Sequence, residues 1–161
     1  MPGLEDLYRE IILDHYRSPR NRGELSAPPA TRTEGFNPLC GDEIVVFVEL
    51  DGNTVSDIRI AGQGCSISQS SASMMSAAVK GKTLAEVTDL TTAFKAMMSI
   101  HESHLDGGAP DPDGEVIEAQ DVKLGDLEAL QGVVKFPVRI KCATLSWNTL
   151  AQALSEDAAK A

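Results

Sequence analysis

The chain has 161 residues, of which 42% are hydrophobic and 24% are charged, and it carries a formal net charge of −10. This length suits about one domain with its own core. A mean hydropathy of −0.11, without an apolar run near the roughly 20 residues of a bilayer span, argues against a membrane protein. The acidic balance argues against nucleic acid and anionic membranes as partners, because both require a concentrated basic surface; a protein with a basic surface fits better.

The first third of the chain predicts a helix followed by a small antiparallel sheet. The acidic N-terminus lacks the basic and then apolar order of a signal peptide, so we expect a cytoplasmic protein. Apolar residues at spacings of three and four predict an amphipathic helix over residues 4–16. Residues 31–36, 43–50 and 54–61 have the composition of strands, and the turn formers at 51–53 predict that the last two pair as a hairpin.

The middle of the chain predicts helices. Residues 66–80 predict a helix whose small residues pack on the sheet, and Gly81 stands where a C-cap belongs. The segment Thr83-Leu84-Ala85-Glu86 has the spacing of a capping box, and a further helix is expected over about 90–101.

The last third predicts a long loop and two further helices. Residues at about 103–122 are rich in glycine, proline and acids, which is typical of a mobile surface loop. A short helix over 124–130 and a terminal helix from Ala143 onward complete a single domain over residues 1–161.

Three cysteines and one aspartate form the candidate site. Cys40 lies in the turn Asn37-Pro38-Leu39-Cys40-Gly41-Asp42, Cys65 follows Gly62-Gln63-Gly64, and Cys142 precedes the terminal helical pattern. A reducing compartment disfavours disulfides, and an odd number leaves one thiol unpaired, so metal binding or a reactive thiol is the better interpretation. With the Asp42 carboxylate, these thiolates supply the four donors of a tetrahedral zinc shell.

The placement of these residues predicts different roles for them. Cys65 and Cys142 are expected to precede helices, where backbone N–H groups favour a thiolate. Cys40 has the freest backbone and is therefore the thiolate expected to leave the metal and react. Arg139 and Lys141 stand two apart in an expected extended approach to Cys142, from which either cation could offset the surplus negative charge.

Four segments carry a resemblance to a known family. They resemble the SufU branch of the IscU/NifU-like iron–sulfur assembly family over nearly the whole chain. The segments are Asn37-Pro38-Leu39-Cys40-Gly41-Asp42, Gly62-Gln63-Gly64-Cys65-Ser66-Ile67-Ser68, Gly125-Asp126-Leu127-Glu128-Ala129-Leu130-Gln131-Gly132 and Arg139-Ile140-Lys141-Cys142-Ala143-Thr144-Leu145. In the scaffold branch a histidine usually precedes the last cysteine. In this chain Lys141 stands at that position, and in this respect the chain resembles SufU-type members.

The resemblance implies a fold, a metal and a partner. It implies an α+β, SufE/IscU-like architecture, with a small antiparallel sheet packed against helices and an N-terminal helix. It implies zinc held by Cys40, Asp42, Cys65 and Cys142. It also implies a SufS-type pyridoxal-phosphate cysteine desulfurase as the partner. A histidine of that enzyme would displace Cys40, which then accepts sulfur as a persulfide.

Three interpretations of the site follow. We favour a zinc-dependent sulfurtransferase in which Cys40 accepts the sulfur, while Arg139 and Lys141 tune the charge or contact the partner. The alternative is a scaffold that assembles a [2Fe–2S] cluster on the same ligands. A structural zinc domain that acts only as an interaction partner is the third interpretation. The sequence names no downstream sulfur acceptor.

The histidines are expected to lie outside the site. His101 and His104 have helical spacing for a shared metal, but they border the predicted loop and lack a third partner nearby in the sequence. His15, at the end of the first predicted helix, is expected to be a capping or surface residue.

Overall fold

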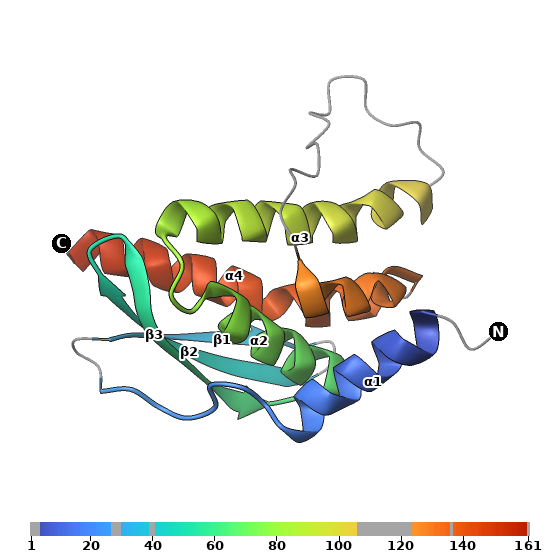
Figure 1. The fold of residues 1–161 in the computed structure, drawn as a ribbon, viewed down its shortest axis with the longest axis horizontal. Coiled ribbons are helices and arrows are strands. Elements are labelled where there is room, and N and C mark those ends of the chain that lie inside the picture. Colours follow the sequence, from blue (N-terminus) through green and yellow to red (C-terminus); the bar gives the residue numbers. More distant parts are fainter. Residues whose placement is uncertain (1–3, 27–29, 39–40, 106–123, 136, 161) are drawn as a thin grey trace.

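The computed structural model shows an α+β fold, as predicted (Figure 1). It describes residues 4–26, 30–38, 41–105, 124–135 and 137–160. Strands β1 (Thr31–Asn37), β2 (Asp42–Asp51) and β3 (Thr54–Gln63) form one antiparallel sheet in the order β1-β2-β3. The three strands coincide with the predicted ones to within two residues at each end, which confirms the hairpin and its turn.

One face of the sheet packs against the helices, and the other face is more exposed, although Phe47 on it is buried. On β2, the side chains of Ile44, Val46 and Val48 are buried toward the helices, while Glu43 points outward and is exposed. This alternation follows from the two-residue period of a strand. The buried face ends at Asn37 and Asp42, which form the last pair between β1 and β2 at one end of the sheet.

Helices α2 (Ser66–Val79) and α4 (Pro137–Lys160) cover the buried face (Figure 1). Helix α1 (Leu4–Arg17), the 3₁₀ segment η1 (Gly125–Lys135) and helix α3 (Leu84–Leu105) pack outside them. The α4 helix spans β1 and β2, and a stacked pair of rings, Phe94 and Trp147 at 4.9 Å between centroids, joins it to α3. None of these helices is long and apolar enough to cross a membrane.

Helix α2 packs on β3 of the sheet, in line with the prediction, and it also packs on the helices α1 and α4. Its buried serines bond to the backbone of its neighbours. Ser70 Oγ donates to the Ile12 carbonyl of α1 at 2.8 Å, and Ser71 Oγ donates to the Ala143 carbonyl of α4 at 2.5 Å. Each hydroxyl thus has a partner despite its burial, and the short side chains allow three helices to approach closely.

Two helix starts differ from the prediction. The predicted capping box is present, since Glu86 N–H donates to Thr83 Oγ1 at 3.2 Å, but α3 runs without interruption from Leu84. The α4 helix begins at Pro137, well before Ala143. Proline suits the first helical position because its missing N–H would have no partner there, and this start signal precedes the segment that we expected to be extended.

His15 is buried and is not a surface or capping residue, so this expectation is wrong. Its ring nitrogens bond to Ser73 Oγ of α2 and to Asp126 Oδ2 of η1, each at 2.8 Å. Ser73 Oγ also accepts the Arg20 backbone N–H at 2.8 Å. A buried imidazole with both nitrogens occupied pins α1, α2 and η1 together. Helix α3 continues to Leu105, so residues 103–105 of the loop predicted at about 103–122 are helical. The rest of that predicted loop and the side chains of His101 and His104 lie outside the described residues.

Candidate metal centre

Three of the four predicted ligands meet in space. The side-chain donor atoms of Asp42, Cys65 and Cys142 all lie within 4.8 Å of one another. They come from the start of β2, the N-cap of α2 and the second turn of α4. The fourth predicted ligand, Cys40, lies outside the described residues. Segments more than 20 residues apart in the sequence thus converge at the end of the sheet where Asn37 of β1 pairs with Asp42 of β2.

Asp42 is a fully buried carboxylate. Its Oδ1 accepts the Cys65 backbone N–H at 2.8 Å, and its Oδ2 lies 3.5 Å from Asn37 Nδ2. Among the described side chains, no arginine, lysine or histidine forms an ion pair with it. A buried carboxylate is costly unless a positive charge compensates it, and a metal ion supplies that charge.

Cys65 is the N-cap of α2, as the sequence predicted. Its backbone is extended, and its Sγ accepts the Ser68 N–H at 3.4 Å. This bond uses one of the N–H groups that a helix start leaves without an intrahelical partner. The same geometry places partial positive charge beside the sulfur and favours a thiolate.

Glycines before Cys65 allow the close approach of β3 to Asp42. A Cβ atom on Gly64 would lie 2.5 Å from Asp42 Oδ1, and Gly62 has a φ of 120°, which side chains other than glycine rarely adopt. Gly64 is therefore required for close packing against the Asp42 carboxylate, and Gly62 for the backbone conformation beside it.

Cys142 is buried within α4 and does not precede it. Its Sγ lies 3.8 Å from the Val138 carbonyl oxygen of the preceding turn and 3.6 Å from Asn37 Nδ2. Since the helix begins at Pro137, the predicted position of this cysteine at a helix N-terminus is wrong. The neighbouring β1 strand, through Asn37, supplies the polar contact instead.

Arg139 and Lys141 lie on α4, so the prediction of an extended approach is also wrong. Both side chains are exposed, and neither forms an ion pair with a described residue. On a helix, Arg139 stands one turn before Cys142 on nearly the same side, whereas Lys141 is rotated by about 100°. Arg139 lines a groove that also contains Ser66, the residue after Cys65.

The donor set fits zinc. Zinc–sulfur bonds of about 2.3 Å and zinc–oxygen bonds of about 2.0 Å place tetrahedral ligand atoms roughly 3.5–3.8 Å apart. Cys65 Sγ and Asp42 Oδ2 are already 3.9 Å apart, and the widest separation in the group is under 4.8 Å. Small side-chain rotations would therefore close these three donors around one ion, leaving one tetrahedral position for a fourth ligand.

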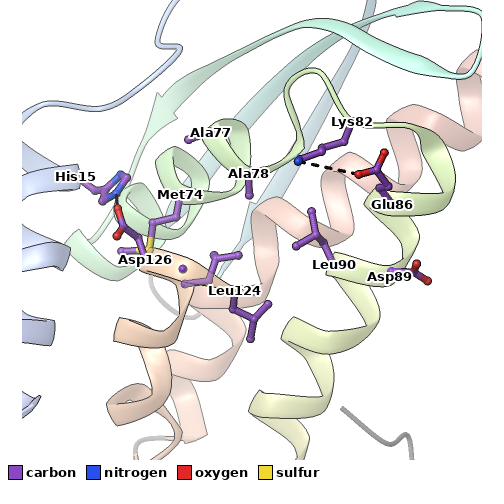
Figure 2. Close-up of a pocket in the computed structure, with 12 residues that line it drawn as sticks. His15, Met74, Ala77, Ala78, Lys82, Glu86, Asp89, Leu90, Leu124 and Asp126 are labelled. Carbon is purple, nitrogen blue, oxygen red and sulfur yellow. Dashed lines mark hydrogen bonds and ion pairs between the residues drawn. The ribbon is translucent and has the colours of Figure 1, made fainter. Parts of the chain in front are cut away.

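A separate hollow of about 520 Å³ lies between α2, α3 and the start of η1 (Figure 2). His15 and Asp126 lie side by side at one end, and the Lys82–Glu86 pair lies at the other, with 4.0 Å between Nζ and Oε2. None of the three described donor residues lines it. The candidate chemistry is therefore located at the sheet end and not in this hollow.

Comparison with known proteins identifies the family. The family model described as the NifU-like N terminal domain matches residues 7–143. The chain belongs to this NifU-like family. The match includes all four residues that the sequence resemblance implied as ligands. The resemblance to the IscU/NifU-like family is thus confirmed.

Individual NifU-like relatives cover almost the whole chain. The chain is 42% identical over 154 residues to a Bacillus subtilis protein named zinc-dependent sulfurtransferase SufU, covering 96% of this chain and 93% of that one. It is 39% identical over 155 residues to a Streptococcus pyogenes protein named iron-sulfur cluster assembly scaffold protein IscU, covering 96% of this chain and 87% of the relative.

A solved NifU-like structure confirms the architecture. The crystal structure of a putative iron-sulfur cluster assembly scaffold protein for the SUF system, from Fervidobacterium islandicum, matches with a TM-score of 0.66 and 31% identity. The match covers 94% of this chain and 99% of that chain. The predicted α+β fold of this family, with its N-terminal helix, is therefore correct.

Proposed function

We propose that this NifU-like protein is a zinc-dependent sulfurtransferase that accepts persulfide sulfur from a SufS-type cysteine desulfurase for iron–sulfur cluster assembly. The convergence of Asp42, Cys65 and Cys142 within 4.8 Å carries the proposal. The 42% identity to a protein named for this activity supports it.

The residues have distinct roles in this proposal. Asp42, Cys65 and Cys142 hold the zinc together with Cys40, and Cys40 is also the sulfur acceptor. When bound, zinc would keep its cysteine ligands as thiolates at neutral pH. Arg139, exposed one turn before Cys142, and Lys141 are available for the partner's surface and not for the buried Asp42.

The transfer step balances without an added oxidant or reductant. The Cys40 thiolate attacks the outer sulfur of the desulfurase's cysteine persulfide, and a new S–S bond forms on Cys40. The S–S bond of the desulfurase breaks, and its cysteine leaves as a thiolate. One sulfur atom moves, and no net electrons are transferred between the two proteins.

A second candidate is a scaffold that assembles a [2Fe–2S] cluster on the same residues. The 39% identity to a protein named as a scaffold supports it, and thiolates are the usual cluster ligands. The carboxylate of Asp42 favours zinc, because zinc accepts carboxylate oxygen as well as sulfur ligands, whereas clusters are usually held by thiolates.

Metal analysis of protein purified without oxygen distinguishes the two candidates. We expect a colourless protein with about one zinc per chain. A brown, iron-rich and zinc-free preparation would favour the scaffold and remove the zinc proposal.

A further inference from the structure

Asn37 is the polar side chain that stands between two of the three metal donors. It ends β1 and pairs with Asp42 in the β1–β2 ladder. Its side chain is 6% exposed, and its Nδ2 lies 3.5 Å from Asp42 Oδ2 and 3.6 Å from Cys142 Sγ. One buried amide thus contacts the carboxylate and a sulfur that come from residues 100 positions apart.

The orientation of this amide follows from the charges around it. An amide nitrogen carries two N–H donors, whereas its oxygen is only an acceptor. Turning the oxygen toward Asp42 and Cys142 would place lone pairs against two anions. The NH₂ group therefore faces the two donor atoms. Its N–H groups offset part of their negative charge without placing a positively charged side chain in the site.

The amide also completes the immobilisation of Asp42. The Cys65 N–H holds one carboxylate oxygen at 2.8 Å, and Asn37 approaches the other. The carboxylate is thereby held from two elements, the start of α2 and the end of β1. The Cys142 sulfur is held to the same point of the sheet through the same amide.

We propose that Asn37 is a positioning residue for the metal centre, which presupposes the zinc site of the proposed function. It holds the donor atoms of Asp42 and Cys142 in place beside the Cys65 sulfur. The three donor atoms therefore stay close together when the fourth ligand is absent. Partners that orient metal ligands typically contribute about 10- to 100-fold to metal affinity. Asn37 acts through the ligands and is not itself a ligand.

The test compares zinc release by wild type, Asn37→Leu and Asn37→Asp. Leucine has a similar branched shape without donors, and aspartate keeps the shape but adds a negative charge. Zinc transfer to a chromogenic chelator should be about 10- to 100-fold faster in both variants. Asn148→Leu, an exposed substitution on α4, is the matched control and should release zinc at the wild-type rate.

Cobalt substitution separates positioning from a structural role. In Co²⁺-loaded protein, the sulfur-to-metal charge-transfer bands should shift in Asn37→Leu and Asn37→Asp but not in Asn148→Leu. Asn37→Ser, a smaller side chain that keeps a donor, should restore part of the zinc retention. A merely structural role would lower the thermal stability of the metal-free protein and leave the cobalt bands unchanged in every variant that folds.

The outcomes also separate this proposal from the proposed function. If wild type binds zinc and the Asn37 variants release it at the wild-type rate with unchanged cobalt bands, the positioning role is wrong and the sulfurtransferase proposal stands. If wild type binds no zinc, both proposals fall. The last comparison uses Cys40→Ala, which lacks the fourth ligand. The Cys40→Ala protein should retain zinc, whereas the double variant Cys40→Ala with Asn37→Leu should not. Equal retention with and without Asn37→Leu would overturn the inference.

Discussion

The backbone N–H of Cys65 donates a hydrogen bond to Oδ1 of Asp42 at 2.8 Å. This bond joins the N-cap of α2 to the first residue of β2, and the Cys65 side chain at the same time caps the helix by accepting the Ser68 N–H. One residue therefore fixes a ligand in another element and is a candidate ligand itself. The candidate metal centre therefore depends on packing at the end of the sheet that contains Asp42. Mutations at this end should weaken zinc binding more than they lower the stability of the fold.

Gly64→Ala should damage the metal centre by steric conflict. Its Cβ would lie 2.5 Å from Asp42 Oδ1 and 3.1 Å from Asp42 Cα, so the carboxylate must move. We expect loss of zinc stoichiometry and a destabilisation of about 1–3 kcal/mol in chemical unfolding. Gly132→Ala is the control, because a Cβ there meets nothing within 4 Å. Full zinc binding by Gly64→Ala would contradict the observed geometry.

Asp42→Asn should have opposite effects with and without metal. The amide keeps the size of the buried side chain but removes the negative charge, so zinc should transfer to a chelator at least about tenfold faster. The metal-free variant should unfold at a higher denaturant concentration than metal-free wild type, because a buried carboxylate without a cation is costly. Asp89→Asn, on the exposed surface of α3, is the control. Unchanged zinc release would remove Asp42 from the ligand set.

His15→Ala should reduce stability and leave the metal centre intact. The substitution removes two hydrogen bonds of 2.8 Å and opens a cavity beneath α1. We expect about 2–4 kcal/mol lower unfolding free energy. Zinc affinity should stay within about twofold of wild type, because the hydrogen bonds of His15 go to Ser73 and Asp126 and not to the three described donor residues. A variant with the wild-type unfolding free energy, or one that folds but loses zinc, would contradict this purely structural role of the His15 hydrogen bonds.

Asp14→Asn should produce a small, pH-dependent loss of stability. Arg20 holds the pKa of Asp14 below its ordinary value of 3.8, through a hydrogen bond and its charge, at 2.5 Å from the carboxylate. A depressed pKa means that the pair stabilises the folded protein above pH 3.8 and that this contribution is lost as the pH falls through the folded value. The difference in melting temperature between variant and wild type should shrink in acid and in high salt. A difference in melting temperature that does not change with pH would show that the Asp14–Arg20 pair is not its cause.

The sequence predicted the sheet and most helices because their signals are local. The β-branched run of β2, the alternation of β3 and the turn at 51–53 are each recognised within about ten residues. The start of α4 was missed because Arg139, Ile140 and Lys141 alternate as a strand does, while the helix that contains them is set by Pro137 and by packing of Ile140 and Ala143 on other elements.

The candidate site was only partly predictable. The residue types suggested that Asp42, Cys65 and Cys142 share one metal, and the resemblance implied the same ligand set, but contacts between distant segments leave no local pattern that places them together. The burial of His15 depends on Asp126, 111 residues later, and had no local signal. Asn37 stood within a quoted motif without an assigned role, because its two contacts exist only after β1, β2 and α4 have packed together.

The most direct measurement follows the sulfur atom. Zinc-loaded wild type and Cys40→Ser are incubated with a SufS-type cysteine desulfurase and L-cysteine, and the intact mass and modified peptide are determined. We predict that wild type gains one sulfur atom on Cys40, and that Cys40→Ser gains none while it keeps Asp42, Cys65 and Cys142 as metal ligands. Sulfur carried on Cys65 or Cys142, or equal labelling of Cys40→Ser, would contradict the account.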